Sequence, residues 1–322
     1  MDLSLLSYYI YRVLGAVVPL LPPRVGYALF ACFGDLAYNK STVSRENVLD
    51  NLRHVLGAQA SPERLAQIAR AIFRNQARNY YDLFRVAKLR PAQIERLVTV
   101  HGWEHLDQGL AGGKGLLLVT IHFGNLDIVA QMLALRHYPV TVAAEHLKPE
   151  KLFQYVSSLR ASKGIRLIPT DNFLRPLFRA LHQNEIVGLA ADRNLTATGT
   201  VVDFFGAPAL LPDGHIRLAL RTGAKLVTAF SVRKADNTFE AFIEPPLALE
   251  HSGDMERDVH LSMARLVVVL EKYISRYLEQ WVMFQPVWKL PAHLIAAPAA
   301  DETVRLAADE AVHPVSESAA QG

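Results

Sequence analysis

The spacing of apolar residues divides the chain into a helical first part and an alternating second part. Residues 61–89 carry apolar side chains every three or four positions, which is typical of an amphipathic helix. Ser61 is the predicted cap of this helix, and Pro62 fits its first turn. A shorter helix is expected over residues 45–57, with Gly57 as its stop. The pattern therefore predicts a helical region first.

From about residue 97 the pattern changes to short apolar strands separated by helices. Strands are predicted at residues 96–102, 114–121, 139–146, 166–170, 185–191, 224–232 and 240–249. Helices are predicted at residues 125–136, 150–164, 174–183 and 213–223, followed by a long closing helix at 257–281. This alternation indicates an α/β arrangement whose largely parallel sheet is covered on both sides. In such sheets, chemistry gathers where strands lead into helices.

The apolar stretch at residues 3–34 raises the question of a membrane. Its uncharged runs on either side of Arg12 are shorter than the roughly 20 residues of a spanning helix, and prolines interrupt them. Three tyrosines beside Arg12 fit a membrane interface: Tyr8, Tyr9 and Tyr11. The stretch also lacks the cleavage site of a secretory signal. Interfacial binding is the favoured interpretation, and a helical hairpin packed on the protein's own core is the alternative.

Charge is distributed unevenly along the 322 residues. Residues 1–100 hold 13 Lys and Arg against 7 Asp and Glu, whereas residues 291–322 hold one Arg against five acids. A basic and apolar first part suits an anionic membrane surface. The last residues, 295–322, contain too few large apolar side chains to fold and are predicted to be disordered.

Several familiar chemistries lack their motifs. A single cysteine, Cys32, excludes an intrachain disulfide and a cysteine-based zinc site, and it suits a reducing compartment. Residues 109–115 resemble a P-loop, but they lack its first glycine and its final Ser or Thr. The chain has no G-x-S-x-G or G-x-G-x-x-G motif, and its histidines lack the pattern of a metal site. We therefore expect no metal and no covalent serine mechanism.

His122 differs from the other histidines because a strand delivers it directly to a turn and a helix. Asp127 lies in the first turn of that helix, and Asn125 is its predicted cap. From these positions the Asp127 carboxylate could accept the proton of one imidazole nitrogen and leave the other nitrogen as a general base. On chemistry alone, a core histidine satisfied by a capping aspartate explains the pair equally well.

The chain resembles the lipid A biosynthesis acyltransferases and the related phosphatidylinositol mannoside acyltransferases, within the lysophospholipid acyltransferase superfamily. Six stretches carry the resemblance: "LPPRVGYALFACFGDLAY", "RENVLDNL", "HFGNLD" as an H-x4-D block, "LRASKG" around Arg160, "ADRNLTATGTVVDFFGAPALLPDGHIRLALRTGAKLV" and "QWVMFQPVW". The resemblance implies a two-layer α/β acyltransferase fold with a central, largely parallel mixed sheet flanked by helices. It also implies that a fatty acyl group moves from acyl carrier protein or coenzyme A to a hydroxyl of a membrane glycolipid or lysolipid, without a cofactor or an acyl-enzyme.

The resemblance also implies roles for individual residues. His122 would be the general base and Asp127 would orient it, while amides near Gly124 and Asn125 could stabilise the developing oxyanion. Four further polar positions would bind the substrate: Asn125, Arg160, Asp192 and Arg193. A structural ion-pair network is the alternative interpretation of Arg160, Asp192 and Arg193.

Two departures from the lipid A enzymes concern the acceptor. This chain has Asp192–Arg193 where those enzymes usually have Asp-Gln, and Glu279 where they have a proline. The first difference favours the phosphatidylinositol mannoside branch. We therefore expect residues 1–95 to form a helical membrane-interface region and residues 96–294 an acyltransferase domain at the cytoplasmic face of the inner membrane. An acyl thioesterase and a non-catalytic lipid-binding protein remain the alternatives.

Overall fold

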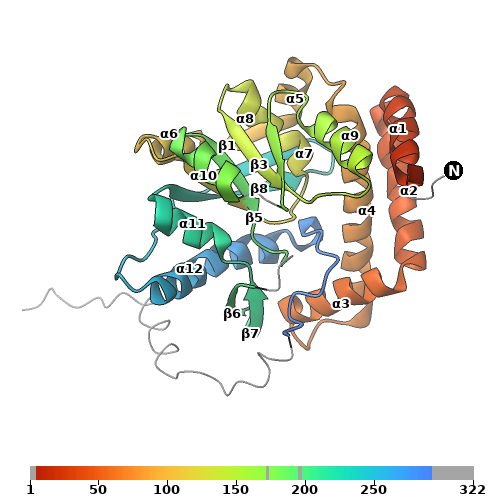
Figure 1. Ribbon diagram of the computed structural model, residues 1–322. Coiled ribbons are helices and arrows are strands. Elements are labelled where there is room, and N and C mark those ends of the chain that lie inside the picture. Colours follow the sequence, from red (N-terminus) through yellow and green to blue (C-terminus); the bar gives the residue numbers. More distant parts are fainter. Residues whose placement is uncertain (1–4, 172–173, 195–197, 292–322) are drawn as a thin grey trace, which may run out of the picture.

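A seven-stranded sheet forms the centre of the computed structural model, which describes residues 5–171, 174–194 and 198–291 (Figure 1). The predicted disordered tail lies outside these residues. The sheet has the strand order β1-β9-β8-β2-β5-β3-β4. Its strands are β1 (Val98–His101), β2 (Leu116–Thr120), β3 (Val140–Ala144), β4 (Arg166–Pro169), β5 (Ile186–Ala190), β8 (Lys225–Arg233) and β9 (Phe239–Ile243).

Neighbouring strands run parallel except for β8 and β9, which form an antiparallel pair. The carboxyl ends of β2, β3, β4, β5 and β8 therefore point to the same edge of the sheet. A separate antiparallel hairpin, β6 (Thr200–Phe204) and β7 (Ala207–Leu211), packs against the closing helix. The mostly parallel mixed sheet that the alternating pattern predicted is confirmed.

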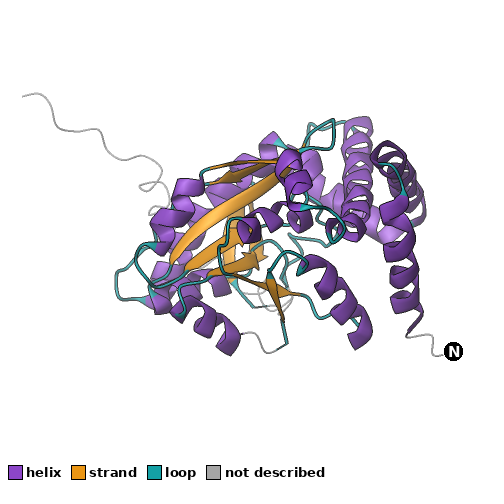
Figure 2. Cartoon of the chain, turned by 90° about the horizontal axis from the view of Figure 1, so that it is seen from above, coloured by secondary structure: helices purple, strands orange, loops and turns teal. Residues whose placement is uncertain are grey.

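Helices cover both faces of the sheet (Figure 2). Leu117 and Val119 of β2 pack on the side of α10 (Leu174–His182), α11 (Gly214–Thr222) and α12 (Met255–Arg276). Leu116 and Leu118, which alternate with them, pack on the side of α6 (Trp103–Leu110) and α8 (Gln131–Leu135). This alternation is the expected result of side chains pointing to opposite faces of a strand. Helices therefore flank the sheet on both faces, and the expected α/β fold class with a mostly parallel mixed sheet is confirmed.

The N-terminal region consists of helices stacked beside the sheet, as the sequence pattern predicted. They are α1 (Leu6–Val17), the short 3-10 turn η2 (Val18–Leu20), α2 (Pro23–Lys40), α3 (Thr42–Leu56) and α4 (Pro62–Val86). The Ser61 hydroxyl accepts a hydrogen bond from the Arg64 amide, and Gly57 ends α3 in the left-handed region. Both predicted helix boundaries are confirmed.

The connecting helices complete the architecture. They are α5 (Pro91–Leu97), which precedes β1, α7 (Leu126–Val129), which follows β2, α9 (Glu150–Arg160), which packs on α1 and α4, and η3 (Leu278–Gln280), which follows α12. Within the described ranges, no helix has both the length and the apolar character needed to cross a membrane. The predicted boundary near residue 95 stays a prediction, because α4 also contacts η3, α7 and α9.

Helices α2 and α4 cross closely because Gly34 has no side chain. A Cβ atom at Gly34 would lie 2.6 Å from the Cα of Arg74, and that backbone has little freedom to move. We predict that Gly34→Ala lowers the free energy of unfolding by about 1–3 kcal/mol, because the added methyl group overpacks the crossing. Urea unfolding measures this loss. Gly214→Ala is the matched control, since a Cβ there meets nothing within 4 Å; equal stability of the two variants would contradict the prediction.

Candidate active site

The imidazole of His122 pairs with the carboxylate of Asp192. His122 Nδ1 lies 2.8 Å from Asp192 Oδ1, and the His122 amide donates to Asp192 Oδ2 over 2.9 Å. The pairing follows from the sheet, because Thr120 of β2 and Ala190 of β5 are partners in parallel register. Two residues further along, His122 and Asp192 are therefore neighbours at the carboxyl edge.

A third group holds the Asp192 carboxylate in place. The indole nitrogen of Trp281 donates to Asp192 Oδ2 over 3.0 Å, and the Asp192 side chain is 1% exposed. The His122 side chain, by contrast, is 38% exposed. Since Asp192 occupies Nδ1, the neutral imidazole carries its proton there and presents a free lone pair on Nε2. No residue that the structure describes forms a hydrogen bond with Nε2, so this nitrogen is available to a substrate.

The structure contradicts the predicted hydrogen bond between His122 and Asp127. The Asp127 carboxylate instead accepts from Arg160, whose Nε lies 2.6 Å from Asp127 Oδ1. The side-chain nitrogen of Gln131 stabilises this arrangement, because it donates to the backbone carbonyls of both Asp127 and Arg160. The charge of Asp127 outweighs the effect of burial and raises the pKa of the Arg160 guanidinium. Arg160 thus forms an ion pair with Asp127, and its substrate-binding role stays a prediction.

Asn125 caps the helix as predicted but has no free group for a substrate. Its side-chain oxygen accepts from the Ile128 amide over 3.1 Å, and its side-chain nitrogen donates to buried Asp82 over 2.9 Å. The residue is 2% exposed. In this structure the side chain supports the loop, and its role in substrate binding stays a prediction.

The amides of the turn are also occupied. The Gly124 amide donates to the Gln280 carbonyl over 2.8 Å, and the Asn125 amide donates to the Ser231 hydroxyl over 3.2 Å. Gly124 adopts a φ of +57°, and a Cβ atom there would lie 1.7 Å from the Ser231 carbonyl oxygen. Both amides therefore already donate to protein acceptors and cannot also bind an oxyanion in this structure. Position 124 requires glycine, because the turn lies against the backbone of Ser231 in β8.

Two further polar groups follow the ends of β3 and β5. Arg193 forms an ion pair with Glu145, with Arg193 Nη1 and Glu145 Oε2 2.5 Å apart. His146 lies between Asp171, which follows β4, and Glu150. The polar side chains expected at strand ends therefore do gather at one edge, with Arg193 bound to a carboxylate that the sequence analysis did not single out.

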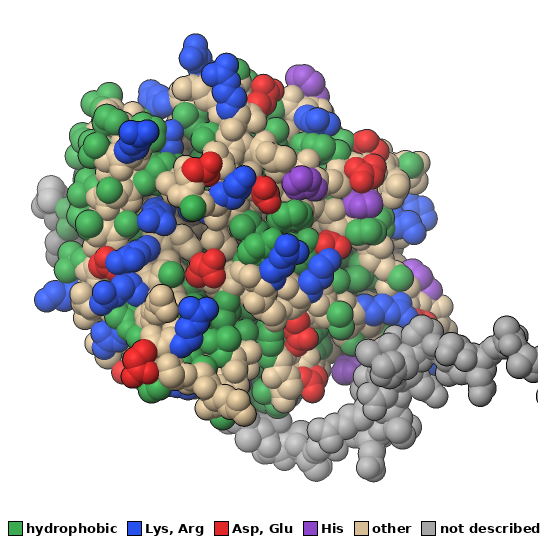
Figure 3. Space-filling view, turned by 180° about the vertical axis from the view of Figure 1, so that it is seen from behind, with side chains coloured by type: hydrophobic (Ala, Val, Ile, Leu, Met, Phe, Trp, Pro, Cys, Tyr) green, Lys and Arg blue, Asp and Glu red, His purple; other side chains and the backbone are tan. Residues whose placement is uncertain are grey.

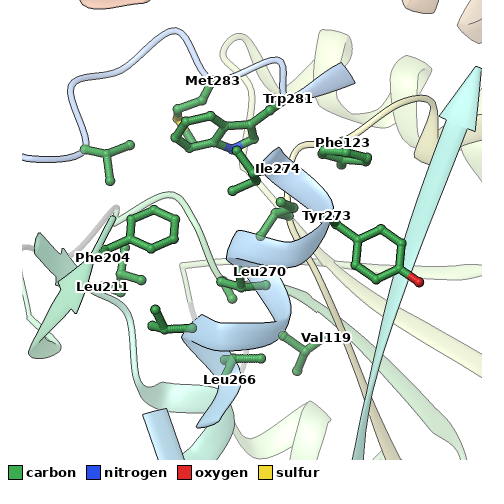
Figure 4. Close-up of a cluster of buried hydrophobic side chains, with 14 of the residues drawn as sticks. Val119, Phe123, Phe204, Leu211, Leu266, Leu270, Tyr273, Ile274, Trp281 and Met283 are labelled. Atoms are coloured by element: carbon green, nitrogen blue, oxygen red, sulfur yellow. The ribbon is translucent and has the colours of Figure 1, made fainter. Parts of the chain in front are cut away.

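The C-terminal segment supplies the groups that sequence reasoning missed. The Val282 amide donates to the His122 carbonyl over 2.8 Å, and Phe123 pairs with Trp281 in an antiparallel bridge. Figure 4 shows Trp281 among buried apolar side chains that include Phe204 and Met283. A tryptophan in a buried segment needs an acceptor for its N–H, and this need was the available signal for a carboxylate partner.

The pKa of His122 results from two opposing effects. Desolvation by its surroundings lowers the pKa, while the charge and the hydrogen bond of Asp192 raise it; the net shift is upward from 6.5. His122 therefore loses its proton at a higher pH than an unperturbed histidine does. His215 of α11 shows the opposite behaviour, since burial lowers its pKa to about 4.

Comparison with known proteins identifies the family to which this arrangement belongs. The family model described as bacterial lipid A biosynthesis acyltransferase matches residues 2–290, nearly all of the described chain. The chain belongs to this family. The resemblance inferred from the "HFGNLD" and "QWVMFQPVW" stretches is therefore confirmed.

Individual relatives lie in two branches of this acyltransferase family. A phosphatidylinositol mannoside acyltransferase of Mycobacterium tuberculosis is 37% identical over 190 residues, which cover 56% of this chain and only 59% of that protein. One from Mycolicibacterium smegmatis is 30% identical over 249 residues, 76% of this chain and 79% of that protein. The lipid A biosynthesis lauroyltransferase of Escherichia coli is 27% identical over 193 residues, 59% of this chain and 61% of that protein.

The pairing of His122 with Asp192 predicts how this member of the acyltransferase family titrates. In an NMR titration, the His122 signal should have a pKa above 6.5 in the parent protein, and a lower one in Asp192→Asn. Asp127→Asn is the matched control and should cause a much smaller change, because Asp127 does not contact the imidazole. Signals are assigned by their loss in His122→Gln. A larger shift in Asp127→Asn than in Asp192→Asn would refute the pairing.

The same shift has a consequence for stability. Because the folded state raises the pKa of His122, protonated His122 stabilises the fold fully at pH values below its unfolded pKa. This contribution is lost as the pH rises through the folded pKa. We therefore predict that Asp192→Asn removes a stabilising contribution of protonated His122, so that the variant loses more free energy of unfolding near pH 5 than near pH 8. Urea unfolding of the parent, Asp192→Asn and His122→Gln/Asp192→Asn at both pH values measures the difference.

Proposed function

We propose that the protein transfers a fatty acyl chain from an acyl thioester, carried by acyl carrier protein or coenzyme A, to a hydroxyl of a membrane glycolipid. The observation that carries this proposal is the partly exposed imidazole of His122, which pairs through Nδ1 with buried Asp192 at the carboxyl edge of the sheet. Two relatives that are 37% and 30% identical to this chain are named phosphatidylinositol mannoside acyltransferases, whereas the lauroyltransferase is 27% identical, so we propose an acceptor of the mannoside type over lipid A.

In the proposed reaction, His122 acts as a general base. Its Nε2 takes the proton of the acceptor hydroxyl as that oxygen attacks the carbonyl carbon of the thioester. The new carbon–oxygen bond forms, the carbon–sulfur bond breaks, and the proton passes from the imidazolium to the departing thiolate. Asp192 stabilises the imidazolium between these steps and fixes its orientation, as the carboxylate of a catalytic triad does. The acceptor oxygen is the nucleophile, so no acyl-enzyme forms.

Arg160 and Arg193 are the groups we propose for holding the polar parts of the substrates. Both lie at the site and are partly exposed, with side chains that are 34% and 25% accessible. Asp127 and Glu145 each engage only part of a guanidinium that has five N–H donors. The remaining donors suit a phosphate or a sugar hydroxyl, because guanidinium groups bind oxyanions through paired hydrogen bonds.

The outer face of α1 and α2 is the proposed membrane-binding surface. It consists of exposed apolar side chains: Leu6, Tyr9, Ile10, Val13, Val17, Leu20, Val25, Leu29, Phe33 and Leu36. The inner face of α1 packs through Tyr8, Tyr11 and Leu14 on the core that α2, α4 and α9 share. The two interpretations of the N-terminus thus describe two faces of one hairpin. The exposed apolar face supports a position in a membrane interface, and we propose the cytoplasmic side of the inner membrane for it.

The base assignment is tested with His122→Ala. We predict that this variant loses acyl transfer by a factor of about 10²–10⁴ while it keeps its fold, because proton transfer is lost and the side chain is partly exposed. Mass spectrometry of products from acyl thioester and phosphatidylinositol mannoside measures the loss. Turnover equal to that of the parent would eliminate the base role.

The same assay separates the alternative functions. Free fatty acid as the only product, with or without the lipid acceptor, would show a thioesterase in which His122 activates water. Lipid binding without any turnover by the parent protein would show a non-catalytic binding protein. Acylated acceptor lipid supports the proposed transferase.

The membrane surface is tested by introducing a charge. We predict that Val13→Glu weakens binding to phospholipid vesicles by about tenfold or more, because a carboxylate on a face that enters the interface must be desolvated. Co-sedimentation measures the binding. Val268→Glu on α12 is the matched control, because Val268 is 58% exposed and Val13 is 62% exposed. Equal binding by both variants would assign the docking face elsewhere.

A further inference from the structure

A pocket lies at the corner where α1 turns into α2. It has a volume of about 240 Å³. Leu21 and Pro23 of the connection form one wall, and Arg85, Lys88 and Gln93 from the end of α4 and the start of α5 form the polar wall. The pocket is therefore lined by two cations and an amide, and by no acidic side chain.

The charge beneath the pocket is not balanced. Arg85 Nη1 donates to the Tyr27 hydroxyl over 3.0 Å and lies 3.4 Å from Asp82 Oδ1, while Arg233 donates to Asp82 Oδ2 over 2.7 Å. Two guanidinium groups thus share one fully buried carboxylate. Within the described part of the chain, Nε and Nη1 of Arg233 have no hydrogen-bond partner. This cluster carries an excess positive charge.

One member of this cluster reaches the pocket. Of the three charged groups in the cluster, only Arg85 lines the pocket, and Arg85 is itself 9% exposed. Lys88 adds a second positive charge at the rim. Burial lowers the pKa of nearby Arg78, and repulsion by Arg233 and Arg74 lowers it further. An anion in the pocket would offset a charge that the protein leaves uncompensated.

The surroundings of the pocket indicate what kind of anion fits. Leu20, which precedes the pocket wall, is 79% exposed, and Val17 and Val25 on either side are 51% and 53% exposed. In Figure 3, which shows the molecule from behind, hydrophobic side chains alternate with Lys and Arg along the left-hand edge that α1 and α2 occupy. A ligand here meets a cationic pocket directly beside an apolar surface.

We propose that this pocket binds the phosphate group of an anionic membrane phospholipid that is not itself a substrate. The phosphate contacts Arg85 and Lys88, and Gln93 donates from the side, while the acyl chains lie beside Leu20 in the interface. The site rests on the membrane docking proposed above. It adds to that docking a fixed point, which sets how the α1–α2 corner is oriented on the surface.

The experiment compares binding of the full-length protein to phosphatidylcholine vesicles with and without phosphatidylglycerol. The parent should bind the anionic vesicles more tightly, and Lys88→Glu should weaken this binding by about tenfold or more, since each cation near an anionic surface contributes measurably. Lys88 is exposed, so the variant should fold, and circular dichroism checks this. Gln93→Leu, which changes no charge, should also weaken binding.

Arg24→Glu distinguishes the pocket from diffuse attraction. Arg24 is exposed at the same corner but does not line the pocket, so its charge reversal should weaken binding by no more than a few-fold. Equal losses in Arg24→Glu and Lys88→Glu, with no effect of Gln93→Leu, would overturn the proposal.

Vesicle binding by the parent protein distinguishes failure of the phosphate site from failure of the membrane docking on which it rests. Binding of the parent to both kinds of vesicle with equal affinity would leave the docking in place and overturn the phosphate site. Failure to bind either kind would overturn both.

Inorganic phosphate alone should not raise the melting temperature of the parent. A rise that Lys88→Glu abolishes would show a free anion as the ligand and would overturn the commitment to a phospholipid.

Discussion

The buried carboxylate of Asp82 is the point through which the helical region and the sheet constrain each other. It accepts hydrogen bonds from Tyr27 of α2, Arg85 of α4, Asn125 before α7 and Arg233 at the end of β8. A fully buried charge is strongly unfavourable unless such partners compensate it. The partners can meet only when the helices, the turn and the strand have reached their final places. The position of the turn that carries His122 is therefore set by the N-terminal helices as well as by the sheet.

Much of the fold was predictable because its signals are local. Ser61 and Gly57 mark helix ends through the conformations of their own backbones and immediate neighbours, and these positions are found as predicted. The alternation of apolar strands with helices also determines the sheet type, because a parallel strand needs a crossover before the next one. The gathering of polar side chains at one edge of the sheet follows from this topology.

The partners within the site were not predictable in the same way, because several carboxylates compete for each cation. The predicted pair of His122 and Asp127 rested on their places at a strand end and in the following helical turn, and on the H-x4-D resemblance. The order β2–β5 brings Asp192 beside His122 from 70 residues away, and α9 brings Arg160 to Asp127 from 33 residues away. Strand order is a property of the whole sheet, so residue spacing within one motif does not reveal it. The partner of Asn125 was not predictable either. Its side chain donates to Asp82, which belongs to a helix that is distant in sequence.

The contribution of Trp281 and its neighbours ties the site to the order in which the chain is made. The turn that carries His122 forms its backbone hydrogen bonds with Gln280 and Val282, and the indole of Trp281 completes the surroundings of Asp192. All three follow the closing helix, so they leave the ribosome after every strand of the sheet. A nascent chain can hold every strand of the sheet before this segment is made, but the pair at its edge lacks its final support until the segment arrives. Assembly of the site is thus among the last events of synthesis.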